Sequence, residues 1–123
     1  MEDDSKEIYE AYKAEVAEIL TQMRRSYETL KKRFDTDTLN DIARSCHKLK
    51  GAAGMMDYSH TVELAKEMES VFKLIIGKKL ELKPETINIL SEGLEMLTKY
   101  VQTDFDDRDE KLLEKLRKLY VNL

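Results

Sequence analysis

Apolar residues recur every three or four positions along most of the chain, a spacing typical of helices that bury one face. The first apolar stripe runs from Ile8 to Leu30 and predicts a long helix that is capped by Asp4 or Ser5. Four further stripes predict helices over about 37–56, 59–76, 84–101 and 107–123. The pattern therefore predicts an all-helical chain.

Residues that commonly begin or end helices stand between these stripes. Residues 35–37 provide a turn and an N-cap, Gly77 provides a C-cap, and Pro84 suits a first helical turn. Asp107 and Glu110 match a capping box before the last helix. Short connections between long helices favour antiparallel neighbours. We therefore expect an all-α fold, an up-down antiparallel four-helix bundle with an additional C-terminal fifth helix, in one domain over 1–123.

The composition narrows the class of protein. Of the 123 residues, 41% are hydrophobic and 37% are charged, which suits a single helical core with a well-solvated surface. The net charge of −4 and the lack of a basic stripe argue against nucleic-acid binding. No apolar run approaches the ~20 residues of a membrane span, and the acidic start is unlike a signal peptide. We therefore expect a cytoplasmic domain that is monomeric in isolation and does not bind membranes.

The sulfur-containing side chains are expected in the core. The single cysteine, Cys46, lies in the middle of an apolar stripe and cannot form an internal disulfide, which suits a reducing cytosol. Adjacent helical residues point about 100° apart, so Cys46 is expected to be buried and not paired with the histidine that follows it. Gly93 is expected at a close helix contact. Five methionines are expected to fill the core: Met23, Met55, Met56, Met68 and Met96.

His47 is the centre of the candidate chemistry. It is one of two histidines, and it falls about a quarter turn from the centre of its apolar stripe. Its ring is therefore expected at the edge of the core, half packed and half in water. Gly51 and Gly54 lie on the same side of the helix, although an interior glycine costs about 1 kcal/mol relative to alanine. Open space beside the ring would let another protein's surface approach it.

A helical hairpin about Tyr58 would bring an acid to this histidine. His47 and Glu69 lie equally far from Tyr58 along the chain, and the same register places Lys50 opposite Lys66. A carboxylate at one ring nitrogen fixes the tautomer and makes the other nitrogen a better nucleophile. The two lysines, one turn away, would attract anions. The spacing therefore predicts a nucleophile, an orienting base and a cationic surrounding.

The segment HKLKGAAGM, from His47 to Met55, resembles the H-x-[LI]-K-G-x-[AS]-[AG] signature of histidine-containing phosphotransfer (HPt) domains. Residues 62–69 resemble the next helix, which in the N-terminal phosphoacceptor (P1) domains of chemotaxis-type histidine kinases ends in a glutamate aligned with Glu69. The resemblance implies that His47 is phosphorylated, that Lys50 and Gly51 are its motif partners, and that Glu69 is hydrogen-bonded to it. In that branch a second histidine often stands where this chain has Lys66.

The resemblance also implies partners. His47 would accept a phosphoryl group from the ATP-binding domain of a histidine kinase, or from a receiver aspartate, and pass it to a response-regulator receiver domain. The sequence has no G-x-x-x-x-G-K-[ST] loop and no carboxylate cluster beside His47 for Mg²⁺. No cofactor is therefore expected in this domain, and ATP and Mg²⁺ are expected on partner domains. The chain is either a separate relay protein or the first domain of a longer kinase.

Other charged residues leave alternatives open. Arg44, Lys48 and Lys66 are candidates for contact with a partner, together with the two glycines, whereas the lysines, Lys73 included, are equally compatible with ordinary solvation. His60 lies near the predicted turn and is expected to be a surface or capping residue. No metal site is expected, because the two histidines lack a cysteine facing them. The alternative function is a helical adaptor that docks partners without being phosphorylated; a metal-dependent helical enzyme is disfavoured by the missing ligands.

Overall fold

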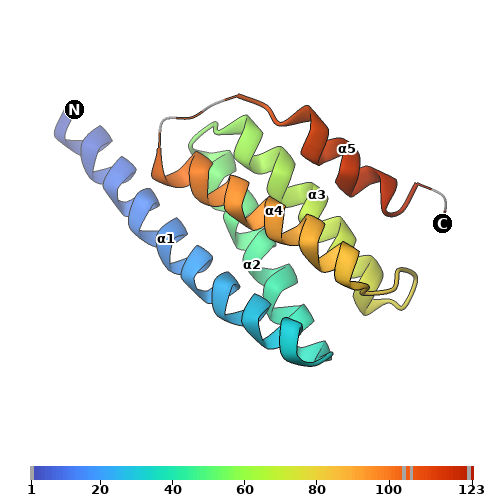
Figure 1. The fold of residues 1–123 in the computed structure, drawn as a ribbon. Helices are drawn as coiled ribbons and strands as arrows, with labels where there is room; N and C mark the ends of the chain where they lie inside the picture. The colour runs from blue at the N-terminus through green and yellow to red at the C-terminus, as the bar shows by residue number, and fades with distance from the viewer. Residues whose placement is uncertain (1, 104, 106, 122) are drawn as a thin grey trace.

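The computed structural model describes residues 2–103, 105, 107–121 and 123, and this part of the chain forms five helices (Figure 1). They are α1 (Glu2–Lys32), α2 (Thr36–Met55), α3 (Ser59–Ile76), α4 (Pro84–Gln102) and α5 (Glu110–Lys118). No residue in the described ranges lies in a strand, so the all-helical prediction is confirmed. None of these helices combines the length and the apolar character that crossing a membrane requires.

Local capping accounts for where α2 and α5 begin. The Asp35 side chain accepts hydrogen bonds from the backbone N–H groups of Asp37 and Thr38, as the predicted turn requires. At α5, however, Asp109 is the N-cap and accepts from the Leu112 N–H, so the predicted capping box beginning at Asp107 is wrong. The predicted caps of α1 are also wrong, because the helix already begins at Glu2.

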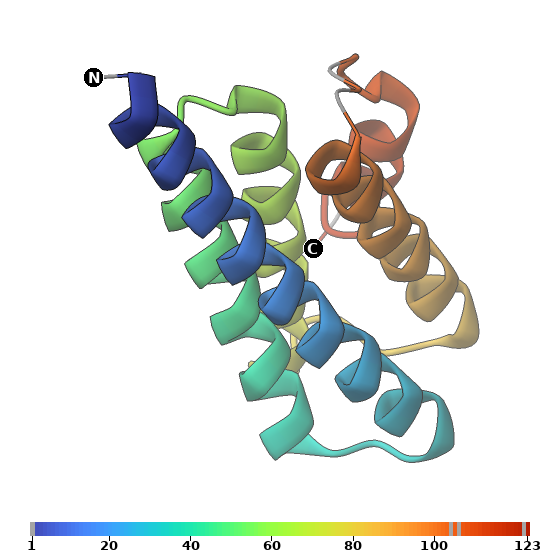
Figure 2. The same cartoon turned by 90° about the vertical axis from the view of Figure 1, so that its left-hand side faces the viewer.

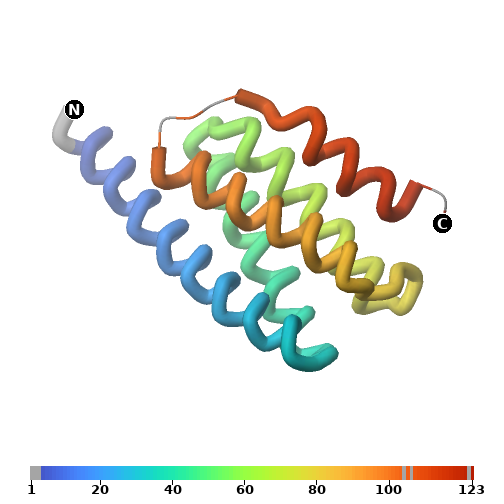
Figure 3. The backbone as a smooth tube through the Cα atoms, viewed as in Figure 1, coloured from blue at the N-terminus to red at the C-terminus, as the bar shows by residue number. Residues whose placement is uncertain are grey.

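The first four helices contact one another in a closed ring. Helix α1 packs against α2 and α4, and α3 packs against the other sides of α2 and α4. The contact between α2 and α3 is the most extensive. Figure 2 shows α1 lying along α2, and Figure 3 shows the longer connection between α3 and α4 looping out at one end. The hydrophobic core fills the space that these helices enclose.

Polar contacts and one glycine set the spacing around α4. The Tyr27 hydroxyl donates to the Leu90 carbonyl over 3.0 Å, and the Lys13 ammonium donates to the Val101 carbonyl. Both bonds join α1 to α4. Gly93 lies so close to α3 that an added Cβ would stand 2.7 Å from the Met68 sulfur. The expected close contact at Gly93 is therefore confirmed.

Helix α5 covers α3 and α4 by burying Leu112, Leu113 and Leu116. Ion pairs reinforce it: the Arg108 guanidinium donates to both Glu63 oxygens, at 2.6 and 2.9 Å. The helix is shorter than predicted, since it ends at Lys118 and Leu123 is exposed.

Most of the core predictions hold, and the exceptions lie near the ends of the predicted helices. Cys46 is completely buried, and this burial raises the pKa of its thiol. Met55, expected in the core, is instead 88% exposed at the last residue of α2. Ile8 is 59% exposed, although it continues the apolar stripe of α1. Together with Leu123, these apolar side chains lie on the surface near the ends of the predicted helices.

Candidate functional site

The imidazole of His47 lies on the exposed side of α2 because neighbouring residues on the other side of the helix are buried in the core. Cys46 and Leu49 are completely buried, and the helical repeat then turns His47 outward. Its side chain is 67% exposed, which is more open than the half-packed position expected from the sequence. The imidazole is therefore accessible to a large partner.

The turn between α2 and α3 brings Glu69 to this ring. Asp57 adopts a left-handed backbone conformation with φ of 60°, and the chain reverses before α3 begins at Ser59. Nδ1 of His47 then lies 3.0 Å from Oε2 of Glu69. The contact predicted from equal spacing about Tyr58 is thus present.

Glu69 is a buried carboxylate with three cationic or polar neighbours. Its side chain is only 6% exposed, although the pattern had placed it at the edge of its stripe. Lys50 donates to Oε1 over 2.8 Å, while the Lys73 ammonium lies 3.4 Å from Oε2, the oxygen that faces His47. The two carboxylate oxygens therefore have different surroundings.

The two lysines keep this carboxylate ionised. Burial raises the pKa of Glu69, but the hydrogen bonds and charges of Lys50 and Lys73 outweigh it, so the pKa lies below its ordinary value. An ionised carboxylate only accepts hydrogen bonds, so Nδ1 of His47 must donate. In the neutral ring this arrangement leaves the lone pair on Nε2, which is the tautomer that a nucleophilic imidazole would need.

A groove of about 690 Å³ opens beside the ring, between α2 and α3. His47, Glu69 and Lys73 line it together with Arg44, and Ala43 and Ile76 add apolar surface. The described residues contain no group of three or more His, Cys, Asp or Glu side chains placed to hold a metal ion. The groove thus brings an exposed imidazole together with two cationic side chains, Arg44 and Lys73.

The predicted docking residues occupy different positions. Arg44 is exposed but is paired with Asp41 on its own helix. Lys48 and Lys66 are exposed, and the Lys50 ammonium contacts Glu69. Sequence reasoning left Lys73 among the solvated lysines. Its position four residues after Glu69 on one helix was the available signal.

The two glycines near His47 lie on open surface. A Cβ at Gly51 would meet no heavy atom within 4 Å, and one at Gly54 would meet only Val62, at 3.9 Å. Packing within the described chain therefore does not explain either glycine. Both leave the surface beside His47 flat.

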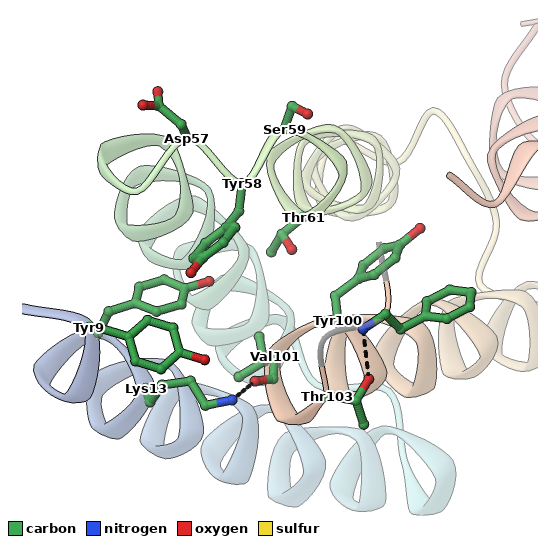
Figure 4. Close-up of a pocket in the computed structure, with 11 residues that line it drawn as sticks. Tyr9, Lys13, Asp57, Tyr58, Ser59, Thr61, Tyr100, Val101 and Thr103 are labelled. Carbon is green, nitrogen blue, oxygen red and sulfur yellow. Dashed lines mark hydrogen bonds between the residues drawn. The ribbon is translucent and has the colours of Figure 1, made fainter. Parts of the chain in front are cut away.

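A second cavity, of about 350 Å³, lies at the end of the molecule near the α2–α3 turn. Figure 4 shows Tyr9 and Lys13 of α1, Tyr58 of the turn and Tyr100 of α4 around it. Burial, followed by the nearby Tyr58 and Tyr9, raises the pKa of the Tyr12 hydroxyl in its wall to about 12. None of the site residues predicted from the sequence lines this cavity. The groove beside His47 is therefore the candidate site.

Comparison with known proteins agrees with this choice. The family model described as "Hpt domain" matches residues 7–103, which span α1 to α4 and exclude α5. The chain is 33% identical over 90 residues to the Chemotaxis protein CheA of Bacillus subtilis (strain 168). That alignment covers 72% of this chain and 13% of the relative, so the chain corresponds to a small part of that protein. The chain belongs to the Hpt domain family, whose members carry out histidine phosphotransfer in two-component signalling.

Proposed function

We propose that Nε2 of His47 accepts a phosphoryl group from the ATP-binding domain of a histidine kinase, or from a receiver aspartate. It then passes the group to a response-regulator receiver domain. The observation that carries this proposal is the 3.0 Å contact between Nδ1 and an ionised, buried Glu69, on a ring that is two-thirds exposed. That arrangement directs the Nε2 lone pair toward solvent and toward any docked partner.

In the proposed reaction, the Nε2 lone pair attacks the phosphorus atom and the bond from phosphorus to the donor oxygen breaks. The electron pair of that bond leaves with the donor. The ring keeps its Nδ1 proton and becomes positively charged, and the facing Glu69 carboxylate balances that charge. Transfer onward reverses these bond changes, with a receiver carboxylate oxygen as the nucleophile.

The partners would supply the rest of the catalytic machinery. Phosphoryl transfer depends mainly on positioning and charge stabilisation, and we propose that ATP and Mg²⁺ are held by partner domains and no cofactor by this one. Lys48, Lys66 and Arg44 are exposed on α2 and α3, the helices that carry His47 and Glu69, and would complement an acidic receiver surface. The flat surface at Gly51 and Gly54 would allow close approach. Association should weaken as salt is added.

The closed ring of helix contacts supports an up-down antiparallel four-helix bundle in a single domain over 1–123. We propose that α5 is the additional fifth helix of that domain, packed on α3 and α4 outside the matched family region. We further propose a cytoplasmic, monomeric domain, either a separate relay protein or the first domain of a longer kinase. The partial coverage of the Bacillus subtilis relative is compatible with the second arrangement.

Radiolabelled ATP and a purified kinase ATP-binding domain test the proposal directly. The wild-type domain should gain an acid-labile, base-stable phosphate and lose it when a receiver domain is added. His47→Gln should abolish labelling while circular dichroism shows unchanged helicity, because the side chain is exposed. The chain has only two histidines, so His60→Gln is the matched control and should label normally.

Two results would contradict the assignment. Labelling retained in His47→Gln would remove His47 from its role. Partner binding by a wild-type domain that no tested kinase or receiver can label would favour the non-phosphorylated adaptor.

A further inference from the structure

We propose that Lys73 is the cation that binds the phosphoryl group on His47, and that it leaves Glu69 to do so. The proposal rests on the proposed function, because it assumes that Nε2 of His47 is phosphorylated. It identifies a phosphoryl-binding residue that the sequence motif does not include, since Lys73 lies on α3, beyond Glu69.

The contacts of the two lysines with Glu69 differ in strength. The Lys50 ammonium lies 2.8 Å from Oε1, and its side chain is mostly covered. The Lys73 ammonium lies 3.4 Å from Oε2, which it shares with Nδ1 of His47, and its side chain is 65% exposed. A charge-assisted hydrogen bond normally measures about 2.7–2.9 Å, so Lys50 is firmly held and Lys73 only loosely. Lys73 is therefore the lysine that can change partners.

Lys73 is also the lysine that shares a groove with His47. The charged or ionisable side chains that line this groove come from α2 and α3: Asp37, Asp41, Arg44, His47, Glu69 and Lys73. Of the two fixed cations among them, Arg44 is already paired with Asp41. Lys48, Lys50 and Lys66 do not line the groove. A phosphoryl group on the exposed ring nitrogen would therefore meet Lys73 as the available groove cation.

Phosphorylation changes the charges in a way that favours this exchange. Once the Nε2–phosphorus bond forms, the ring is positive and faces Oε2, which weakens the attraction of that oxygen for a second cation. At the same time a phosphoryl group brings close to two negative charges at neutral pH. The long side chain of a lysine has several rotatable bonds and carries a compact charge. The Lys73 ammonium is then attracted more strongly by the phosphoryl oxygens than by Glu69, and its side chain turns toward them.

The test uses phosphoramidate, a small phosphoryl donor, so that no partner protein contributes cations. After phosphorylation of His47, a ³¹P NMR titration measures the pH midpoint for the last deprotonation of the phosphoryl group. A nearby cation favours the dianion, so Lys73→Met should move this midpoint upward by about 0.5–1 pH unit. We expect a shift smaller than those of buried charge pairs because the Lys73 side chain is exposed to solvent. Lys73→Arg should stay close to wild type.

Lys79→Met is the matched control, because Lys79 is an exposed lysine that follows α3 and does not line the groove. It removes the same charge and should leave the midpoint near that of wild type. An unchanged midpoint in Lys73→Met, or an equal shift in Lys79→Met, would overturn the role of Lys73 while leaving His47 as the acceptor. A wild-type domain that phosphoramidate cannot label at His47 would instead overturn the acceptor role and, with it, this proposal.

Discussion

The Glu69 carboxylate is almost fully buried, yet it contacts the side chains of His47, Lys50 and Lys73. Lys50 and Lys73 keep it charged, and its charge in turn faces Nδ1, the ring nitrogen that does not react in the proposed function. The proposed reactivity of His47 would therefore depend on Glu69 of the neighbouring helix. A substitution at Glu69 should alter chemistry more than folding.

The Glu69→Gln substitution tests whether the negative charge of Glu69 supports phosphoryl transfer to His47. The amide retains the shape of the side chain but cannot balance the positive charge that forms on the ring, so the rate of phosphoryl acceptance should fall. We expect a loss of about 10- to 100-fold, below the range measured for deeply enclosed electrostatic contacts because the ring is exposed. Single-turnover labelling by a kinase domain measures it, with thermal unfolding as the control. Equal labelling rates would show that the charge of Glu69 is dispensable.

The pairing of His47 with Glu69 could be predicted because it depends on backbone periodicity, which the spacing of apolar residues reveals. The positions of the lysine ammonium groups could not. Lys50 was expected opposite Lys66, but a long side chain can direct its charge several ångströms from its Cα, and here it meets the buried Glu69. Burial of Glu69 was missed for a similar reason: the two lysines offset its desolvation, and their contacts are not visible in the pattern.

At the scale of the helix, the glycines of α2 and α4 occupy contrasting surroundings. Gly51 has open space where a side chain would be, whereas Gly93 has the Met68 side chain against it. Each of these two glycines lowers the stability of its helix by a similar amount relative to alanine. Only the second is accounted for by packing within the molecule.

Alanine substitutions should therefore change stability in opposite directions. Gly51→Ala should raise the free energy of unfolding by about 0.5–1 kcal/mol, because it removes the helical cost of glycine. Gly93→Ala gains the same benefit but overpacks the buried Met68, at a cost of about 1–3 kcal/mol, so the net effect should be destabilising. Urea denaturation measures both variants.

Gly51→Ala also separates stability from docking. If the flat surface serves a partner, this more stable variant should receive the phosphoryl group more slowly from a kinase domain but at the wild-type rate from phosphoramidate. Equal rates with both donors would remove docking as the explanation for the glycine.

The existence of all five helices followed from the apolar stripes, and α3 begins and ends at the predicted residues. The errors in the prediction lie at the ends of the helices. The apolar periodicity can continue past the end of a helix when later apolar residues keep the same spacing, as at Leu123. It also does not show whether the last residue of a helix, such as Met55, packs against a neighbouring helix. The N-cap of α5 is Asp109 and not Asp107. The prediction was wrong because several aspartates precede this helix and the sequence does not show which one serves as the cap.

In the whole molecule, α5 is joined to α3 by charges as well as by leucines. Arg108 and Arg117 both contact Glu63, while Tyr120 and Arg117 contact Glu67. The hydrogen bond from Arg108 is the main cause of a lowered pKa at Glu63 and outweighs the opposing effect of burial. The residues that attach to α3, Arg108, Arg117 and Tyr120, lie beyond the matched family region.

The lowered pKa of Glu63 predicts how stability depends on pH. A carboxylate whose pKa is lower in the folded state adds stability above its unfolded pKa, about 4.3, and this contribution is lost as pH falls through the lower folded value. Wild-type protein should therefore lose stability on acidification more steeply than Glu63→Gln, which has no charge to protonate. Urea denaturation between about pH 6 and 3 measures the slopes. Glu18→Gln, an exposed carboxylate on α1, is the control and should follow wild type; parallel curves for Glu63→Gln would contradict the prediction.

The burial of Cys46 has a practical consequence for studying encounters with other proteins. Its sulfur is inaccessible and poorly ionised in the folded domain, so maleimide dyes and spin labels should bypass it. A reporter cysteine placed on the surface, for example at the exposed end of α2, would then carry the only reactive thiol without any change to the native sequence beneath His47. Fluorescence or electron-resonance distances to a similarly tagged receiver could follow complex formation in real time on a protein whose interior is untouched.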